Sequence, residues 1–252
     1  MKEEFHITFL MFLFPCLLIH NAMSKNCQSL QQVPQLILLD RDGVINQDVG
    51  SPGVVQSSQL KLTPNAGKAI GTLKRAGYKV AMITNQSCVG KGLITEKYLI
   101  NDIHGTLQEM LIEEDSDAMF DHIFYCTSVK GSCDQRMKPN PGMIKEACGL
   151  FDTNSRDCVL IGDAFRDLQA AASGEVPIRI LVETGYGKRL MNGYDAPSDI
   201  SLQLIDEEFI NNHDGGQIKV PEPSQVLPFY YAQNLDHAVR WIMDASSDDS
   251  SS

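Results

Sequence analysis

Two carboxylates follow an apolar run in the stretch LILLDRDGVIN. Asp40 comes directly after Leu36–Leu39, and Asp42 follows two residues later. Residues i and i+2 of an extended segment point to the same side, so both acids would face one ligand, and Gly43 lets the chain turn closely past it. Adjacent carboxylates repel each other unless a cation lies between them, and oxygen ligands favour Mg²⁺. The pair therefore predicts attack by Asp40 on phosphorus, which forms an aspartyl-phosphate, and proton transfer by Asp42.

Residues suited to the same chemistry occur further along the chain. Phosphoryl transfer places negative charge on equatorial oxygens, which calls for a fixed cation and hydrogen-bond donors. Thr84 and Lys138 can supply these, Asp163 would complete a metal site, and Asp167 would hold Lys138 or a metal-bound water. A lone D-x-D or a lone lysine is common on surfaces, so the prediction rests on the order of these groups along the chain.

Short apolar runs that alternate with helical patterns predict the elements that position these groups. The expected strands cover residues 36–39, 79–84, 122–126, 158–162 and 178–182. Helices are expected after Thr63-Pro64, Thr95, Asn140-Pro141 and Asp163. This alternation indicates an α/β fold, with a parallel sheet covered by helices on both faces. Ligands bind such sheets beyond the carboxyl ends of the strands, where Asp40, Thr84 and Asp163 would meet.

Four segments, in chain order, resemble the motifs of the haloacid dehalogenase superfamily of phosphatases: LDRDGVIN, ITNQSCVGKGLIT, RMKPNPGMI and IGDAFRDLQAA. More closely, they resemble its subfamily IIIA branch, which contains D-glycero-D-manno-heptose 1,7-bisphosphate 7-phosphatase and the histidinol-phosphate phosphatase domain. The resemblance covers residues 36–187 and implies a three-layer Rossmann-like domain with a central parallel sheet and a minimal or absent cap. The loop 48–62 and the segment 126–137 would then shape the pocket.

The resemblance also implies a role for each site residue. Asp40 would be the nucleophile and Asp42 the general acid and base. Mg²⁺ would be bound by Asp40, Asp163 and the carbonyl of Asp42. Phosphate and substrate would contact Thr84, Asn85, Gln86, Lys138 and Arg136, with Asp167 in a supporting position.

The segment CTSVKGSCDQRMKP departs from this branch, whose members carry a structural zinc loop with the pattern C-x-H, then C-x-C, before R-K-P. Ser128 and Gln135 stand at two of the four ligand positions. A closed tetrahedral site needs four ligands, so we expect no structural zinc. Cys126 and Cys133 are expected to be thiols, with a disulfide between them as the alternative.

Two further departures concern the cations near the substrate. Met137 separates Arg136 from Lys138, where the family has adjacent basic residues, so a contact of Arg136 with the substrate is open. Ala164 replaces a lysine that is often found after the acid of the fourth motif. Fewer cations are then left for a second phosphate. The segment TGYGKRL, residues 184–190, is interpreted as a turn, and His104 as a packing or surface residue.

The leading interpretation is a Mg²⁺-dependent phosphomonoesterase acting on a small phosphorylated sugar or similar metabolite, with heptose bisphosphate as the best named substrate. Histidinol phosphate, a polynucleotide 3′-phosphate and non-catalytic binding of a phosphorylated ligand are the alternatives. The formal net charge of −11 argues against a nucleic-acid partner. No stable membrane association is expected, and the protein is expected to be a monomer.

The chain is expected to divide into four parts: an N-terminal extension at 1–33, a phosphatase core at 34–190, an irregular excursion with a closing helix at 191–244, and a disordered acidic, serine-rich tail at 245–252. The extension holds an apolar run too short to span a bilayer comfortably, which leaves a signal, a transit element or an untranslated upstream extension open. Seven cysteines without close repeated spacing favour reduced thiols and the cytoplasm. Organelle targeting or secretion stays open because of the apolar N-terminus.

Overall fold

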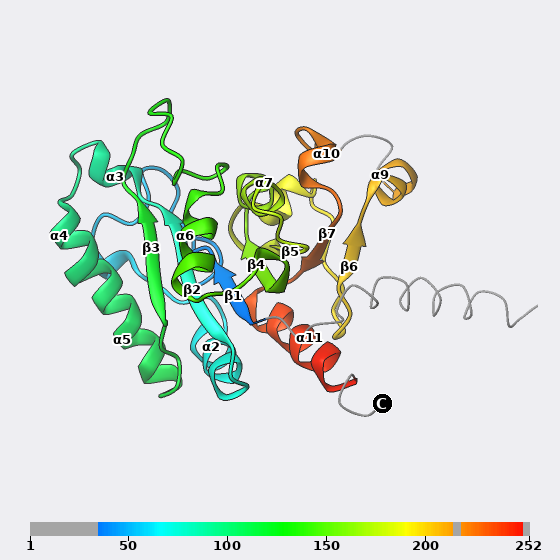
Figure 1. Ribbon diagram of the computed structural model, residues 1–252, viewed down its shortest axis with the longest axis horizontal. Coiled ribbons are helices and arrows are strands. Elements are labelled where there is room, and N and C mark those ends of the chain that lie inside the picture. The colour runs from blue at the N-terminus through cyan, green and yellow to red at the C-terminus, as the bar shows by residue number, and fades with distance from the viewer. Residues whose placement is uncertain (1–34, 214–217, 249–252) are drawn as a thin grey trace, which may run out of the picture. The chain divides into compact units, whose positions relative to one another are not determined.

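A seven-stranded sheet lies at the centre of the computed structural model, which describes residues 35–213 and 218–248. Its strands are β1 (Leu36–Leu39), β2 (Lys79–Asn85), β3 (His122–Cys126), β4 (Cys158–Gly162), β5 (Ile178–Val182), β6 (Gln203–Ile205) and β7 (Phe229–Ala232). The order is β3-β2-β1-β4-β5-β7-β6 (Figure 1). Neighbouring strands are parallel except for the antiparallel pair β6 and β7. The predicted fold, a mostly parallel α/β sheet of the Rossmann type, is confirmed.

Helices lie on both faces of this sheet. On one face, α2 (Ala66–Arg75) packs against α5 (Gly105–Glu114) and α11 (Leu235–Asp248). On the other, α6 (Gly142–Leu150) packs on β2 and β3, while α7 (Phe165–Ser173) packs on β4 and β5 and contacts α10 (Pro223–Val226). The shorter helical segments are η1 (Ser57–Gln59), α3 (Ser87–Gly90), α4 (Glu96–Tyr98), η2 (Leu99–His104), η3 (Ser155–Asp157), η4 (Glu183–Gly187), α8 (Lys188–Leu190) and α9 (Glu207–His213).

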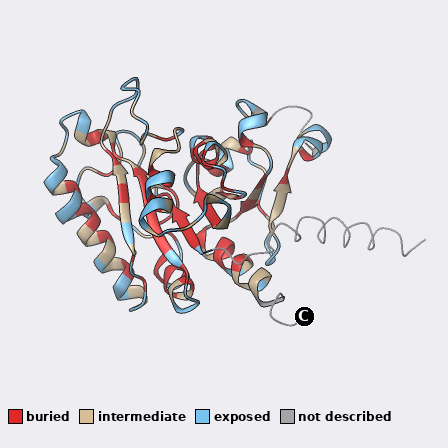
Figure 2. Cartoon of the chain, in the orientation of Figure 1, coloured by how far each residue is buried: buried red, intermediate tan, exposed pale blue. Residues whose placement is uncertain are grey.

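The central strand β1 is fully buried, as its uninterrupted apolar sequence requires (Figure 2). Leu36 and Leu38 belong to a core cluster shared with Met143 and Ile144 of α6 and with alanines of α7. Burial of apolar side chains stabilises by roughly 25 cal/mol per Å². The strand that carries the first acid at its end is therefore anchored by its packing against α6 and α7, which fixes where that acid lies.

The C-terminal part is more ordered than expected. The part of the predicted excursion 191–244 that precedes its closing helix was expected to be irregular, but it contributes β6, α9, α10 and β7. These pieces close a second apolar cluster around α7, β5 and β7, which includes Phe165, Leu181 and Tyr231. Strands of three and four residues leave little local pattern, so their tertiary partners, and not their composition, determine them.

Predictions were also made for the two ends of the chain. Helix α11 runs to Asp248, so the tail predicted from residue 245 begins within a helix, and residues 249–252 lie outside the described part. The predicted extension 1–33 also lies outside it, and the proposed domain boundaries stay predictions. Across residues 35–213 and 218–248, none of the helices combines the length and the apolar character needed to cross a bilayer.

Candidate active site

The carboxyl ends of three neighbouring strands bring the predicted site residues together. Asp40 follows β1, Thr84 lies one residue before the end of β2, and Asp163 follows β4. β1 lies between β2 and β4 in the sheet, so Asp40 stands in the middle. Lys138 reaches the same place from the segment between β3 and α6. The juxtaposition expected from the order of motifs is thus present.

Lys138 bridges two of the acids. Its Nζ lies 2.8 Å from Asp40 Oδ1 and 2.7 Å from Asp167 Oδ1, and it donates a hydrogen bond of 3.0 Å to the carbonyl oxygen of Ile83. Each ammonium proton therefore has an acceptor, which a buried charge requires. Burial lowers the pKa of Lys138, but the charges of Asp167 and Asp40 outweigh it and raise the pKa above its usual value. The lysine is a fixed cation.

Three buried carboxylates crowd around this cation. One oxygen each of Asp40, Asp163 and Asp167 lies within 4.8 Å of the others. Burial raises the pKa of Asp40 to about 6 and that of Asp163 to about 8, and the charge of Asp167 adds to both effects. Lys138 alone does not balance so much negative charge. The cluster fits a divalent cation with oxygen ligands.

The hydrogen bonds of the cluster show which acids would bind such a cation. Asp163 Oδ2 accepts a bond of 2.9 Å from the backbone N–H of Tyr186, while Asp163 Oδ1 is buried and has no hydrogen-bond partner within the described residues. Asp167 instead has one oxygen on Lys138 and the other on the N–H of Ala164, at 3.0 Å. Asp163 and Asp40 therefore fit as metal ligands, and Asp167 holds Lys138.

Two glycines allow the backbone to pass this cluster. Gly43 has a φ of +82° and Gly185 a φ of +65°, which favour glycine, and a Cβ atom on either would overlap the Asp163 carboxylate. The Thr184 hydroxyl donates to the carbonyl oxygen of Gly43. The turn after β5 is thereby tied to the loop that carries Asp40 and Asp42.

Asp42 accepts hydrogen bonds from three side chains. Arg41 Nη2 donates to both of its carboxylate oxygens, at 2.8 and 3.0 Å. Asn46 Nδ2 donates at 3.0 Å and Gln86 Nε2 at 3.3 Å. Burial favours the neutral acid, but the charge of Arg41 and these hydrogen bonds outweigh it and lower the pKa of Asp42. Asp42 is thus ionised and oriented before any substrate arrives.

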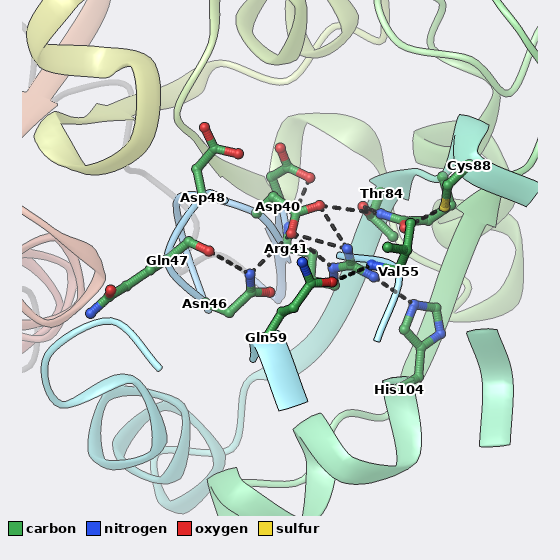
Figure 3. A network of polar contacts seen from close by, with 12 residues as sticks. Asp40, Arg41, Asn46, Gln47, Asp48, Val55, Gln59, Thr84, Cys88 and His104 are labelled. Atoms are coloured by element: carbon green, nitrogen blue, oxygen red, sulfur yellow. Dashed lines mark hydrogen bonds and ion pairs between the residues drawn. The ribbon is translucent and has the colours of Figure 1, made fainter. Parts of the chain in front are cut away.

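Sequence reasoning did not assign Arg41 and His104 to the site. Arg41 contacts Asp42, and His104 contacts Arg41. Arg41 has no exposed surface, and its Nη1 lies 3.5 Å from His104 Nε2 (Figure 3). Burial, with the charge of Arg41, lowers the pKa of His104 to about 3. The available signal was weak: His104 follows Ile103 on the buried side of a helical pattern.

The neutral His104 gives the protein a specific acid sensitivity. An unfolded histidine binds a proton below about pH 6.5, whereas folded His104 stays neutral until about pH 3, so stability falls as the pH drops below 6.5. We expect His104→Gln to reduce the slope of unfolding free energy against pH, between pH 4 and 6, by about 1.4 kcal/mol per pH unit. Urea unfolding at several pH values measures this slope. His122→Gln, at an exposed histidine of β3, is the control, and an unchanged slope in His104→Gln would contradict the assignment.

The polar residues at the end of β2 position their neighbours. Asn85 and the backbone of Lys138 exchange two hydrogen bonds of 3.0 Å, from Asn85 Nδ2 to the Lys138 carbonyl and from the Lys138 N–H to Asn85 Oδ1. Thr84 is buried and accepts a hydrogen bond of 2.8 Å from Gln86 Nε2. Asn85 thus fixes the lysine, and Gln86 joins Thr84 to Asp42.

Arg136 pairs with an acid that does not belong to the cluster. Its Nε lies 3.0 Å from Glu146 Oε1, and both side chains are exposed by about two fifths. In the preceding loop, Asp134 accepts hydrogen bonds from the Ser128 hydroxyl, from the Cys126 thiol and, at 2.8 Å, from the N–H of Arg136. A carboxylate thus links the two ends of this loop, and its cysteines are free thiols.

Fold and site together define a hydrolase in which buried acids and one lysine meet at the carboxyl edge of a parallel sheet. The chain belongs to the haloacid dehalogenase-like hydrolase family, which matches it over residues 30–174. The predictions of this family and of a phosphatase are confirmed.

Relatives in this family have names that specify a substrate. The chain is 35% identical over 166 residues to D-glycero-beta-D-manno-heptose-1,7-bisphosphate 7-phosphatase of Neisseria meningitidis serogroup A, covering 65% of this chain and 86% of the relative. It is 35% identical over 159 residues to the Bordetella bronchiseptica protein of the same name, covering 62% and 85%. A solved structure of D,D-heptose 1,7-bisphosphate phosphatase from B. bronchiseptica, complexed with magnesium and phosphate, superposes with a TM-score of 0.65 at 25% identity, covering 83% of this chain and 98% of that one.

Proposed function

We propose that the protein is a Mg²⁺-dependent phosphatase that removes one phosphate from a sugar bisphosphate, with D-glycero-D-manno-heptose 1,7-bisphosphate as the leading substrate. The observation that carries the reaction is the Lys138 bridge between Asp40 and Asp167, beside the unpartnered oxygen of Asp163. The names of the relatives support the sugar.

The first step assigns attack on phosphorus to Asp40. Its Oδ1 pairs with Lys138 and accepts a hydrogen bond of 2.7 Å from the N–H of Arg41. Among the described residues none donates a hydrogen bond to Oδ2, so this oxygen is the one proposed to attack. Lys138, which pairs with Asp40, and the Thr84 hydroxyl at the end of β2 are proposed to bind the phosphoryl oxygens. The product is an aspartyl-phosphate on Asp40 and a free alcohol.

Asp42 moves the protons in this scheme. An arriving phosphate is a like charge and raises the pKa of the Asp42 carboxyl from its lowered resting value, which lets the group take up a proton. It then protonates the leaving alcohol oxygen and, as a carboxylate again, takes a proton from the water that hydrolyses the aspartyl-phosphate. Arg41, Asn46 and Gln86 keep it oriented through both steps.

Mg²⁺ is proposed to be bound by Asp40, Asp163 and the carbonyl oxygen of Asp42. When bound, it neutralises charge on the cluster and on the phosphoryl group. Asp163 is proposed to act only as a metal ligand. Asp163→Asn replaces a charged carboxylate ligand by a neutral amide, so it should weaken Mg²⁺ binding at least about tenfold. Titration calorimetry with MgCl₂ alone measures this without turnover. Asp152→Asn, at a position outside the site, is the control, and wild-type affinity in Asp163→Asn would contradict the ligand set.

A substrate panel tests the proposal. Release of inorganic phosphate from heptose 1,7-bisphosphate, histidinol phosphate and a 3′-phosphorylated oligonucleotide is measured with Mg²⁺ and with EDTA. We expect Mg²⁺-dependent turnover with the highest kcat/KM on the bisphosphate. A preference for histidinol phosphate or for the oligonucleotide would make that compound the substrate in place of the heptose bisphosphate. No turnover of any ester would favour the non-catalytic alternative.

We further propose a monomeric cytoplasmic protein without a nucleic-acid partner or stable membrane association. The net charge of −11 and the five described free cysteines support this proposal. Size-exclusion chromatography with light scattering tests the oligomeric state, and fractionation of cells that express the full chain tests the compartment.

A further inference from the structure

The turn after β5 lies against the proposed metal site. Helical turn η4 contains Tyr186, whose backbone N–H donates to Asp163 Oδ2 at 2.9 Å. Gly185 packs against Gly43, since a Cβ atom on Gly185 would lie 2.8 Å from the Gly43 Cα. The backbone of this turn is therefore in contact with Asp163 and with the loop that carries Asp40 and Asp42. The sequence pattern had suggested only a turn here.

Two arginines from different elements converge on the Tyr186 ring. The guanidinium carbon of Arg166, near the start of α7, lies 5.9 Å from the ring centroid, and that of Arg189, in α8, lies 4.7 Å from it. Both distances are within the range of cation–π contacts. The Tyr186 ring, whose backbone is bonded to Asp163, thus lies against two positive charges, and Arg166 is near enough to Asp167, Asp40 and Asp163 for their charges to raise its pKa.

These arginines differ from the neighbouring basic residue in having no directly paired acid. Lys188 lies 3.0 Å from Glu183 Oε1 and 2.7 Å from Asp195 Oδ1, so its charge is already balanced. Neither Arg166 nor Arg189 forms an ion pair with a carboxylate of the described residues, and both residues are exposed. In a chain with a net charge of −11, two cations at one place without such a partner are available to an anionic ligand.

We propose that Arg166 and Arg189, with Tyr186 as their platform, form a subsite for the second phosphate of the substrate, the one that is not hydrolysed. Guanidinium groups bind phosphate oxygens in pairs of hydrogen bonds, which suits a terminal phosphate better than a hydroxyl. Lys138 is assigned to the reacting phosphoryl group and is held by Asp40 and Asp167, and Arg136 pairs with Glu146. This inference rests on the proposed function. It assigns to Arg166 and Arg189 the discrimination between a sugar bisphosphate and a monophosphate.

A matched pair of substrates tests the subsite. Heptose 1,7-bisphosphate and heptose 7-phosphate share the reacting phosphate and differ in the second one, so the ratio of their kcat/KM values reports the subsite. We expect the ratio to fall about tenfold in Arg189→Ala and in Arg166→Ala, mainly through a higher KM for the bisphosphate. Lys188→Ala, the adjacent balanced cation, is the control and should keep the wild-type ratio. Unchanged thermal unfolding confirms that each variant is folded.

The role of Tyr186 as a positioning residue needs a separate readout. Tyr186→Ala should lower the same ratio, whereas Tyr186→Phe keeps the ring and should restore it. Wild-type ratios in both arginine variants, or an equal fall in Lys188→Ala, would overturn the subsite. A wild-type enzyme that hydrolyses both sugars equally well would refute this inference alone, whereas a wild-type enzyme that hydrolyses no phosphate ester would refute the proposed function.

Discussion

Asp40→Asn should abolish phosphate release from every substrate that the wild type hydrolyses, with a fall in kcat of roughly ten-thousandfold or more. An amide oxygen is a poor nucleophile and cannot form the aspartyl-phosphate. The fold should survive, because burial already raises the pKa of Asp40 to about 6 and its charge is costly in the folded state. Phosphate release and thermal unfolding without Mg²⁺ measure the two effects.

The stability half of this prediction has a definite sign. Because the folded pKa of Asp40 is above its unfolded value, the folded state loses stability as the pH rises through 6, and a neutral amide at this position removes that loss. Asp40→Asn should therefore unfold at or above the wild-type temperature at pH 8. Activity above about a hundredth of wild type in Asp40→Asn would contradict the nucleophile. Asp48→Asn, at a position in the following loop, is the control for a nearby carboxylate change.

Lys138→Met should damage both stability and activity. Removing the ammonium leaves Asp40 and Asp167 buried without their cation, which costs about 3–5 kcal/mol when a buried ion pair is broken. Loss of a fixed cation beside the phosphoryl group should lower kcat by at least about a hundredfold. Urea unfolding and phosphate release measure the two losses at the same pH.

The pH dependence separates this explanation from a simple packing defect. The stability deficit of Lys138→Met should shrink as the pH falls, because protonation of the buried carboxylates removes the uncompensated charge. Lys145→Met, at an exposed lysine of α6, should leave stability and activity near wild type. A deficit that stays constant from pH 8 to pH 5 would show that the ion pairs are not its source.

Much of this site could be predicted because the carboxyl ends of parallel strands meet at one edge of the sheet. The runs that became β1, β2 and β4 are apolar and unbroken, so Asp40, Thr84 and Asp163 were expected at one edge. The placement of Lys138 followed from its motif. The sequence could not reveal which acid would pair with the lysine, because that depends on side-chain directions at the start of α7.

Other parts depended on contacts distant in sequence. Arg41 gave no local sign that it would be fully buried against Asp42, and His104 lies 63 residues away from it. The Arg166 and Arg189 contacts with Tyr186 join α7 to α8 across the turn after β5. Strands β6 and β7 are short: β7 pairs with β5, and β6 pairs with β7 alone. Periodicity cannot encode such pairings, because each arises only when the sheet is assembled.

The most direct test of the central claim is to trap the phosphoryl group on Asp40. In Asp42→Asn, a substrate with a good leaving group, such as p-nitrophenyl phosphate, needs no acid for the first step but lacks the base for the second. Acid quenching after mixing with Mg²⁺, followed by peptide mass spectrometry, should show a phosphoryl group on the peptide that contains Asp40. A phosphoryl group on another residue, or continued turnover without any phosphorylated peptide, would contradict nucleophilic catalysis by Asp40.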